Sequence, residues 1–360
     1  MKNLKGKIVS HDNLFIGEIT FEEKINNINK IESNDYDNYI IPGFIDLHCH
    51  GGNGFDTMEG IESIDKMASF QLSRGTTSLL ATTWTSSFEH TYKALDGFNK
   101  LISSKNNLIG VHLEGPFINP NKLGAQPALT QKPSEEFIKK IMSISDIKII
   151  TLAPEIEGME SFIPFLIENN IQVQFGHSLA NYNCCNKYMK SFDIGFTHLY
   201  NAMSGNDHRN PGVLTAALLD AEYAEIICDL QHVKESSIKV ASKCIPKLYA
   251  VTDSVGAAGL KDGDYKFANV NITKKEEKIT LTNSSILAGS VINMYQSFLN
   301  LLSIGYSIQE VVSMTSYNAS KYLKINDIGK IAKGCRSNFL LLDKNYKLID
   351  IYLNGEKIVR

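Results

Sequence analysis

Long hydrophobic runs, paired-cysteine motifs and an excess of charge of one sign are all missing from this sequence. Its 360 residues are 43% hydrophobic and 21% charged, with a net charge of −3. No stretch approaches the ~18 uninterrupted apolar residues of a membrane span. A weakly acidic balance provides no electrostatic footprint for nucleic acid or anionic lipid, and this apolar fraction excludes a disordered chain. We expect a folded protein that binds neither nucleic acid nor membrane.

The cysteines and the first residues bear on the cellular compartment. None of the six cysteines stands in a CxxC spacing, which argues against a thiolate zinc site or a thioredoxin-like redox motif. Residues 1–10 are basic but no apolar segment follows them, so they do not have the pattern of a signal peptide. Both features predict a cytoplasmic protein.

The middle of the chain repeats one pattern, in which a short apolar run ends in polar residues and a helical pattern follows. The runs occupy residues 43–50, 76–83, 108–115, 147–154, 171–177, 194–198, 225–230 and 248–253. Near-continuous apolar strands that alternate with helices are typical of parallel strands buried on both faces. Eight of them predict an α/β fold, a (β/α)8 TIM barrel over residues 43–325.

An open, doubly wound sheet is the alternative to the barrel. That fold would place a glycine-rich phosphate loop after its first strand, and segment 51–54 (GGNG) lacks the GxGxxG spacing. Residues 1–42 and 326–360 differ from the middle, because they contain short strand candidates with polar flanks. We expect both termini to pair into one small β-sandwich domain beside the barrel.

Histidines and carboxylates stand where five of the predicted strands end. They are His48, His50, Glu114, His177, His198 and Asp253. In a barrel the carboxyl ends of the strands meet at one mouth, and imidazoles and carboxylates are the ligands that zinc, iron and manganese use. A single buried histidine is more often a core residue than a ligand. Five strand ends with the same residue types are hard to produce by packing alone, so we predict a metal site.

Asp253 ends the eighth strand and has two interpretations. An acid at the end of an apolar strand is costly unless it is paired or bound. The structural interpretation is a helix N-cap, because Ser254 and a glycine follow Asp253. The functional interpretation, which the other polar strand ends favour, is a general base for a metal-activated water.

Five motifs resemble those of the amidohydrolase superfamily and, within it, the N-acetylglucosamine-6-phosphate deacetylase family. They are 42–51 (PGFIDLHCHG), 112–117 (HLEGPF), 176–178 (GHS), 197–203 (THLYNAM) and 251–253 (VTD). The resemblance covers residues from about 40 to 345. It implies metal-dependent hydrolysis of N-acetyl-D-glucosamine 6-phosphate to D-glucosamine 6-phosphate and acetate, in amino-sugar catabolism and cell-wall sugar recycling.

The resemblance also implies roles for the polar strand ends. Glu114, His177 and His198 match the principal metal ligands of the family. His48 and His50 match ligands of a second metal that only some members bind, and Asp253 matches the catalytic acid and base. We therefore expect one or two divalent metals per subunit, zinc first, with iron, manganese or cobalt as alternatives.

Further residues match the family's substrate contacts. They are Asn201 and Ala202 at the sugar phosphate, His232 beside the sugar and the scissile amide, and Leu287, Ala288 and Gly289 in a loop near the substrate. Arg209 matches an arginine that reaches the phosphate of the neighbouring site across a homodimer interface. A guanidinium suits that role because it binds phosphate through two parallel hydrogen bonds. The alternative for Arg209 is an ordinary solvated surface residue.

Gln126 departs from the family pattern, which usually has a histidine at this place. A glutamine donates a hydrogen bond but carries no charge, so we expect Gln126 to contact the substrate and to alter affinity for the sugar or its phosphate.

Other functions stay open at this point. The substrate could be N-acetylgalactosamine 6-phosphate, or the protein could be another amidohydrolase, of the D-aminoacylase or dihydroorotase kind. A non-catalytic sugar-phosphate sensor on the same barrel should have lost Asp253 or a metal ligand, and neither is lost.

Overall fold

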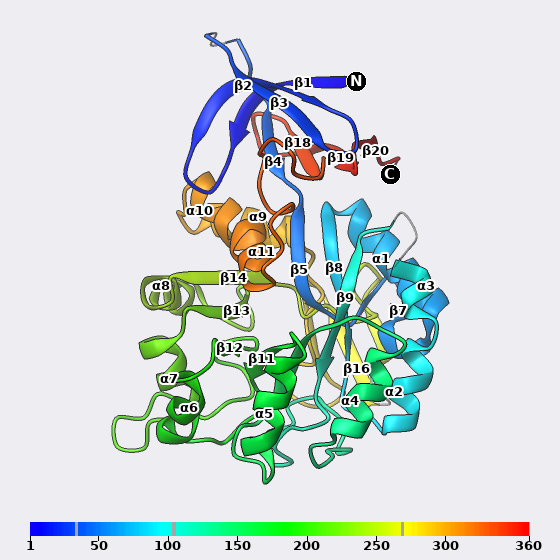
Figure 1. Ribbon diagram of the computed structural model, residues 1–360, viewed down its shortest axis with the longest axis vertical. Coiled ribbons are helices and arrows are strands. Elements are labelled where there is room, and N and C mark those ends of the chain that lie inside the picture. The colour runs from blue at the N-terminus through cyan, green and yellow to red at the C-terminus, as the bar shows by residue number, and fades with distance from the viewer. Residues whose placement is uncertain (33–34, 103–105, 268–269, 360) are drawn as a thin grey trace.

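The computed structural model describes residues 1–32, 35–102, 106–267 and 270–359. Both ends of the chain build one seven-stranded sheet at the top of Figure 1. In spatial order its strands are β20 (Glu356–Lys357), β19 (Leu348–Leu353), β18 (Phe339–Leu342), β4 (Tyr39–Pro42), β1 (Lys2–Val9), β2 (Leu14–Phe21) and β3 (Ile25–Lys30). The expectation of a separate sheet domain is confirmed.

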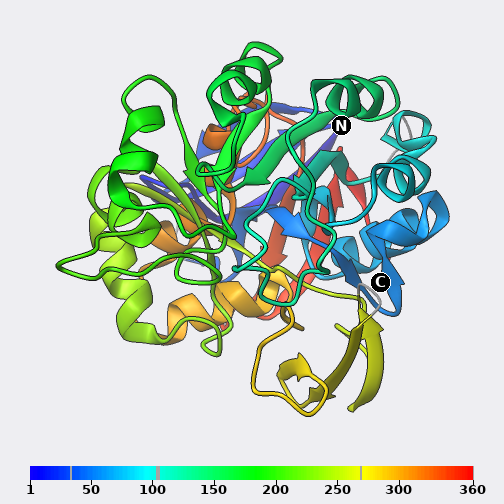
Figure 2. The ribbon, with the colours of Figure 1, turned by 90° about the horizontal axis from the view of Figure 1, so that it is seen from below.

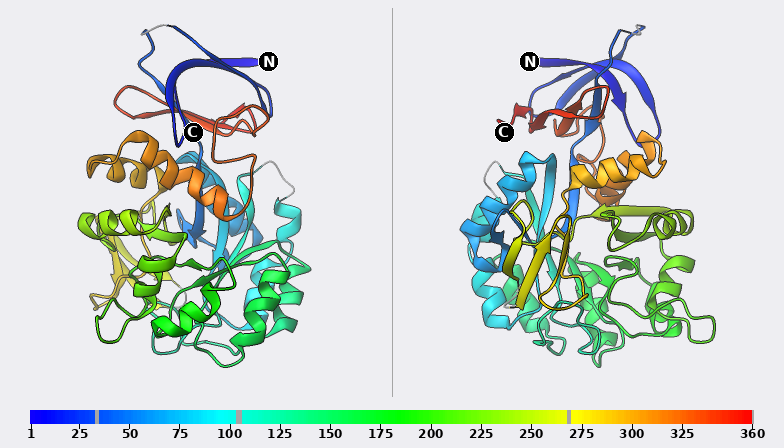
Figure 3. Two further views of the ribbon diagram at one scale, coloured as in Figure 1. Left: turned by 60° about the vertical axis from the view of Figure 1, so that its left-hand side comes forward. Right: turned by 180° about the vertical axis from the view of Figure 1, so that it is seen from behind.

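The expected β-sandwich takes a different form. β4 pairs with β1 on one side and with β18 on the other, so hydrogen bonding is continuous through all seven strands. The sheet bends over, and Phe21 packs against Phe339 with the ring centroids 4.8 Å apart. Figure 3 shows the N-terminal strands lying above the C-terminal ones. One bent sheet therefore replaces two separate sheets, because β4 joins both halves.

A curled parallel sheet lies below this domain. Its six strands, in order, are β5 (Phe44–Cys49), β8 (Thr76–Thr83), β9 (Leu108–Glu114), β10 (Ile147–Leu152), β11 (Gln172–Phe175) and β12 (Gly195–Phe196). A parallel pair, β13 (Tyr223–Ile227) and β14 (Lys247–Val251), follows. Each of the eight predicted runs overlaps one of these strands. β8 is buried along its whole length, as expected for a parallel strand covered on both faces.

Hydrogen bonds connect the two parallel sheets at their ends. The Leu199 N–H, just after β12, donates to the Glu225 carbonyl of β13 at 2.9 Å. On the other side, the Asp253 N–H donates to the His48 carbonyl of β5 at 2.8 Å. These bonds bring the carboxyl ends of β5, β12, β13 and β14 to the same side of the molecule.

Helices form an outer layer around the parallel strands (Figure 2). They are α1 (Ile61–Ser73), α2 (Phe88–Leu95), α3 (Phe98–Ile102), α4 (Glu135–Met142), α5 (Met159–Glu168), α6 (Tyr182–Met189), α7 (Val213–Asp220), α8 (Glu235–Cys244), α9 (Met294–Ser303), α10 (Ile308–Val312) and α11 (Asn318–Tyr322). In α4, Phe137, Ile138 and Ile141 are buried and Lys140 faces solvent, the spacing of an amphipathic helix. Among the described residues, no helix is both long enough and apolar enough to cross a membrane.

A three-stranded antiparallel sheet between β14 and α9 was not expected from the sequence. It contains β15 (Gly263–Phe267), β16 (Val270–Lys275) and β17 (Lys278–Leu281), and it stands apart from the ring of helices in Figure 2. Phe267 lies between Trp84 and His50, with centroid distances of 5.0 Å and 5.7 Å. This small sheet therefore walls one side of the mouth formed by the strand ends.

Candidate active site

The structure brings together all six polar residues found at the ends of the predicted strands. His48 lies in β5 with His50 just beyond it, Glu114 ends β9, and the others follow β11, β12 and β14. None of the six is more than 8% exposed. They form two clusters of nitrogen and oxygen atoms, and Glu114 belongs to both.

The first cluster joins Glu114, His177 and His198. The Glu114 Oε1 atom lies 3.0 Å from Nε2 of His177 and 3.0 Å from Nε2 of His198. The two Nε2 atoms are also 3.0 Å apart. Three donor atoms thus converge on one small volume.

The second cluster joins His48 and His50 to Glu114 and Asp253. The His50 Nε2 atom lies 3.1 Å from Glu114 Oε2 and 3.2 Å from Asp253 Oδ1. The Nε2 atoms of His48 and His50 are 3.2 Å apart. Glu114 therefore directs one carboxylate oxygen at each cluster.

The hydrogen bonds of the rings show which nitrogen faces the clusters. Nδ1 of His177 donates to the Lys122 carbonyl at 2.9 Å, and Nδ1 of His50 donates to the Thr82 carbonyl at 3.1 Å. In a neutral ring held this way, the lone pair is on Nε2. The lone pairs of several Nε2 atoms then face one another and two carboxylates, an arrangement that only a proton or a cation stabilises. The clusters therefore fit one or two divalent metals.

Electrostatics favours a cation in the same place. Burial opposes charge on His50, but Asp253 and Glu114 raise its pKa to about 9. Burial also opposes ionisation of Glu114, but His48, His177 and His198 hold its pKa well below the usual value. The pKa of Asp253 is lowered as well, because His48 and His50 outweigh the effect of burial. Both carboxylates are therefore ionised at neutral pH.

The backbone around the site is strained. His177, His198 and Asp253 have φ angles of 48°, 28° and 49°, and Ala202 has 49°. Such left-handed conformations cost non-glycine residues of order 1–3 kcal/mol each, and they persist where the surroundings hold them. Their concentration at the strand ends indicates a site shaped for function.

A cavity of about 430 Å³ opens over the clusters, a size typical of small-ligand sites. Its wall includes most residues that the family resemblance assigns to the substrate, namely Gln126, Asn201, Ala202, His232, Leu287 and Gly289. Lys122 also lines it and is the one lysine or arginine among the described residues that does so. The ring of His232 is held by Asp229, with Nδ1 2.6 Å from Oδ2.

Three of the residues expected to contact the substrate differ from the others: two do not line the cavity, and one lines it but is already hydrogen-bonded to other residues. Ala288 does not line the cavity, because its side chain is fully buried in the cluster that contains Val255 and Ile279. Arg209 is exposed in the loop before α7 and lies outside the cavity of its own chain. Gln126 lines the cavity but is already engaged: its Oε1 accepts from the Thr85 N–H at 2.7 Å, and its Nε2 donates to Glu114.

Comparison with known proteins places this site in a family. The model of the amidohydrolase family matches residues 39–358. The chain belongs to the amidohydrolase family. It is similar to N-acetylglucosamine-6-phosphate deacetylase of Lysinibacillus sphaericus, with 35% identity over 321 residues, 86% of this chain and 83% of the relative. N-acetylgalactosamine-6-phosphate deacetylase of Escherichia coli O157:H7 is 28% identical over 328 residues, 88% of this chain and 87% of that protein.

A solved structure extends the likeness to the whole amidohydrolase fold. The crystal structure of N-acetylglucosamine-6-phosphate deacetylase from Thermotoga maritima superposes with a TM-score of 0.93 at 33% identity and covers 100% of both chains. The terminal sheet and the curled parallel sheet are thus parts of one shared architecture.

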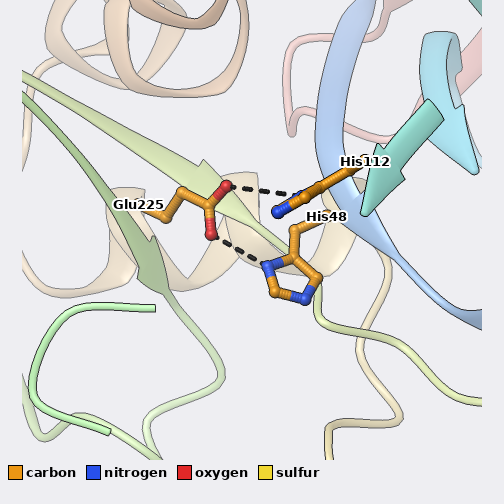
Figure 4. A group of neighbouring side chains, drawn as sticks. All are labelled: His48, His112 and Glu225. Atoms are coloured by element: carbon orange, nitrogen blue, oxygen red, sulfur yellow. Dashed lines mark hydrogen bonds and ion pairs between the residues drawn. The ribbon is translucent and has the colours of Figure 1, made fainter. Parts of the chain in front are cut away.

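Glu225 is a member of this amidohydrolase site that the sequence reasoning missed. It lies in β13 beneath the clusters, fully buried, between His48 and His112 (Figure 4). Its signal was present, because an acid inside a buried parallel strand is costly unless it has a partner. The partner, His48, is 177 residues away in the sequence, so no local pattern connects the two.

Proposed function

We propose that this amidohydrolase removes the acetyl group from N-acetyl-D-glucosamine 6-phosphate and releases D-glucosamine 6-phosphate and acetate. The observation that carries the proposal is the pair of donor clusters that share Glu114 under the cavity, with Asp253 beside them. The relatives named for this reaction support it over most of the chain. The reaction belongs to amino-sugar catabolism and cell-wall sugar recycling.

The two clusters are assigned to the metal. Glu114, His177 and His198 would hold one ion, and His48 and His50, with Glu114 and Asp253, would hold a second. The donor set of imidazoles and carboxylates favours zinc, with iron, manganese or cobalt as alternatives. A metal bound there supplies Lewis-acid polarisation of the amide carbonyl and acidifies the hydrolytic water.

Asp253 is assigned the proton transfers. Its carboxylate is ionised at neutral pH, as its lowered pKa requires, so Oδ1 accepts a proton from the attacking water. The same oxygen then returns the proton to the leaving nitrogen. His232, whose Nδ1 donates to Asp229, lines the cavity and would contact the sugar beside the scissile amide.

The phosphate is assigned to the part of the cavity beside Asn201 and Ala202. A Cβ atom at Gly124 would lie 3.7 Å from the Ala202 methyl, so the loop that carries Lys122 borders this turn. Lys122 supplies a cation from the same chain. Arg209, exposed in the loop that projects before α7 (Figure 2), would supply a second one to the neighbouring site of a homodimer.

The closure of the barrel, the domain bounds and the cellular location belong to the same proposal. The eight parallel strands form one closed (β/α)8 barrel over residues 43–325, supported by the bonds from β12 to β13 and from β14 to β5. Residues 1–42 and 326–360 are the small second domain. A cytoplasmic location is supported by the six cysteines, all free thiols.

The second candidate function is deacetylation of the galactosamine epimer, which the Escherichia coli relative favours. A sensor without activity is disfavoured, because Asp253 and all five candidate metal ligands are in place.

Acetate release from the two N-acetylhexosamine 6-phosphates, measured with zinc-loaded protein, tests the proposal. The expected result is a higher kcat/KM for the glucosamine compound. A higher value for the galactosamine compound would assign the second candidate, and no release from either would contradict both.

A further inference from the structure

Glu225 connects the two donor clusters from below. Its Oε2 accepts a hydrogen bond from Nδ1 of His48 at 2.9 Å and another from the backbone N–H of His198 at 3.2 Å. His48 belongs to the second cluster and His198 to the first. One carboxylate oxygen therefore holds a residue of each cluster.

The other oxygen of Glu225 is poorly satisfied. Oε1 makes no hydrogen bond within the described part of the chain, and Nδ1 of His112 lies 4.0 Å away from it (Figure 4). His112 is itself engaged, with Nδ1 bonded to the Leu47 carbonyl at 2.9 Å and Nε2 to Thr151 at 2.8 Å. A buried carboxylate with one oxygen left over costs stability, so its presence indicates a functional role.

The anchoring of His198 adds a second reason. The rings of His48, His50 and His177 are each fixed by a hydrogen bond from Nδ1. Nδ1 of His198 has no partner among the residues that the structure describes. His198 also has the strained φ angle of 28°. Its N–H bond to Glu225 is therefore a principal restraint on where its Nε2 atom lies.

We propose that Glu225 is a positioning residue that holds both clusters in the geometry that binds metal. It keeps the His48 proton on Nδ1, which leaves the Nε2 lone pair facing the cluster, and it fixes the backbone of His198. Carboxylates that accept from the far nitrogen of a metal-binding histidine raise metal affinity in this way. The proposal rests on the metal sites of the proposed function but is independent of the substrate.

Zinc affinity of the metal-stripped protein, measured by competition with a chromophoric chelator, tests this role. Glu225→Ala is expected to weaken zinc binding by roughly 10- to 100-fold. Glu225→Gln should lose only part of this, about tenfold at most, because the amide oxygen still accepts from His48. Glu222→Gln is the matched control: this glutamate precedes β13, is paired with Lys247 at the surface, and should leave zinc affinity unchanged.

A double-mutant cycle separates positioning from a general structural role. If Glu225 acts through His48, the effect of Glu225→Ala on zinc affinity becomes much smaller in a His48→Ala background. Equal effects in both backgrounds would overturn the part played by His48. The thermal midpoint of each metal-free variant identifies any that fail to fold, and Glu225→Gln then carries the comparison.

Wild-type zinc affinity in both folded Glu225 variants would overturn the proposal. Acetate release is not measured in this test, so a failure of the positioning proposal can be told apart from a failure of the proposed function. A protein that binds zinc through Glu225 but releases no acetate would contradict the proposed function and leave the positioning role intact.

Discussion

Replacing Lys122 by methionine gives the sharpest prediction about the substrate. The backbone carbonyl of Lys122 accepts from Nδ1 of His177, and Lys122 lines the cavity next to the turn at Ala202. Methionine keeps an unbranched apolar side chain of nearly the same length and removes the ammonium group, with its charge and its N–H donors. We expect binding of a phosphorylated sugar to weaken and the chemical step to be unchanged, because the reacting amide lies at the metal clusters.

The size of the effect follows from the exposure of Lys122. A hydrogen bond to a charged group contributes about 1.5–3 kcal/mol. Lys122 is half-buried, so solvent screens its charge and the lower end of that range applies. Since 1.4 kcal/mol is a factor of ten, KM for N-acetylglucosamine 6-phosphate should rise about tenfold. An unchanged kcat is expected when a contact is equally strong in the ground and transition states.

Steady-state acetate release with phosphorylated and unphosphorylated N-acetylglucosamine measures this. Lys122→Met should leave KM for the unphosphorylated sugar unchanged. Lys132→Met is the control, because Lys132 is 87% exposed and paired with Glu157 at the surface. Equal changes in KM for both sugars, or no change for either, would refute the placement of the phosphate beside Lys122.

Three further changes test other parts of the account. Asp253→Asn should lower kcat by roughly 10²- to 10⁴-fold while mass spectrometry still finds the ion held by Glu114, His177 and His198, and near-normal turnover would remove Asp253 from the proton transfers. Arg209→Ala should raise KM for the phosphorylated sugar, and mixing it with Asp253→Asn should restore activity through mixed dimers; no restoration would place Arg209 in its own site. Burial raises the pKa of Asp56 to about 8, above the unfolded value near 3.9. Between about pH 5 and 7 the folded chain keeps this proton and the unfolded chain has lost it, so the free energy of unfolding falls by up to about 1.4 kcal/mol for each unit that the pH rises. Urea unfolding of Asp56→Asn should show a flatter pH dependence, and an unchanged slope would exclude this origin.

The curled parallel sheet and its polar strand ends could be predicted from the sequence because both have local signals. Parallel strands covered on both faces require apolar side chains throughout, as in β8, and this leaves short runs that are easy to recognise. His48 and His50 share a face because the side-chain period of a strand is two. The convergence of residues from different strands then follows from the way parallel strands meet at their carboxyl ends.

The rest depended on contacts that have no local signal. Lysines stand in both β16 and β17, so these strands lack the apolar pattern of a buried strand, although Phe267 of the neighbouring β15 lines the cavity. The motif that contains Ala288 could be located, but the direction of its side chain follows from packing against Val255. Gln126 could be recognised as a departure, but its bonds to Thr85 and Glu114 join three separate segments.

The central claim is that the two clusters hold the metal required for amide hydrolysis. The most direct measurement is acetate release from N-acetylglucosamine 6-phosphate by metal-stripped protein to which zinc is added back in equivalents. We predict negligible release before addition, and a rate that rises and saturates at one or two equivalents per chain. His177→Ala should prevent this recovery. Full activity of the stripped protein, or none after zinc is restored, would contradict the account.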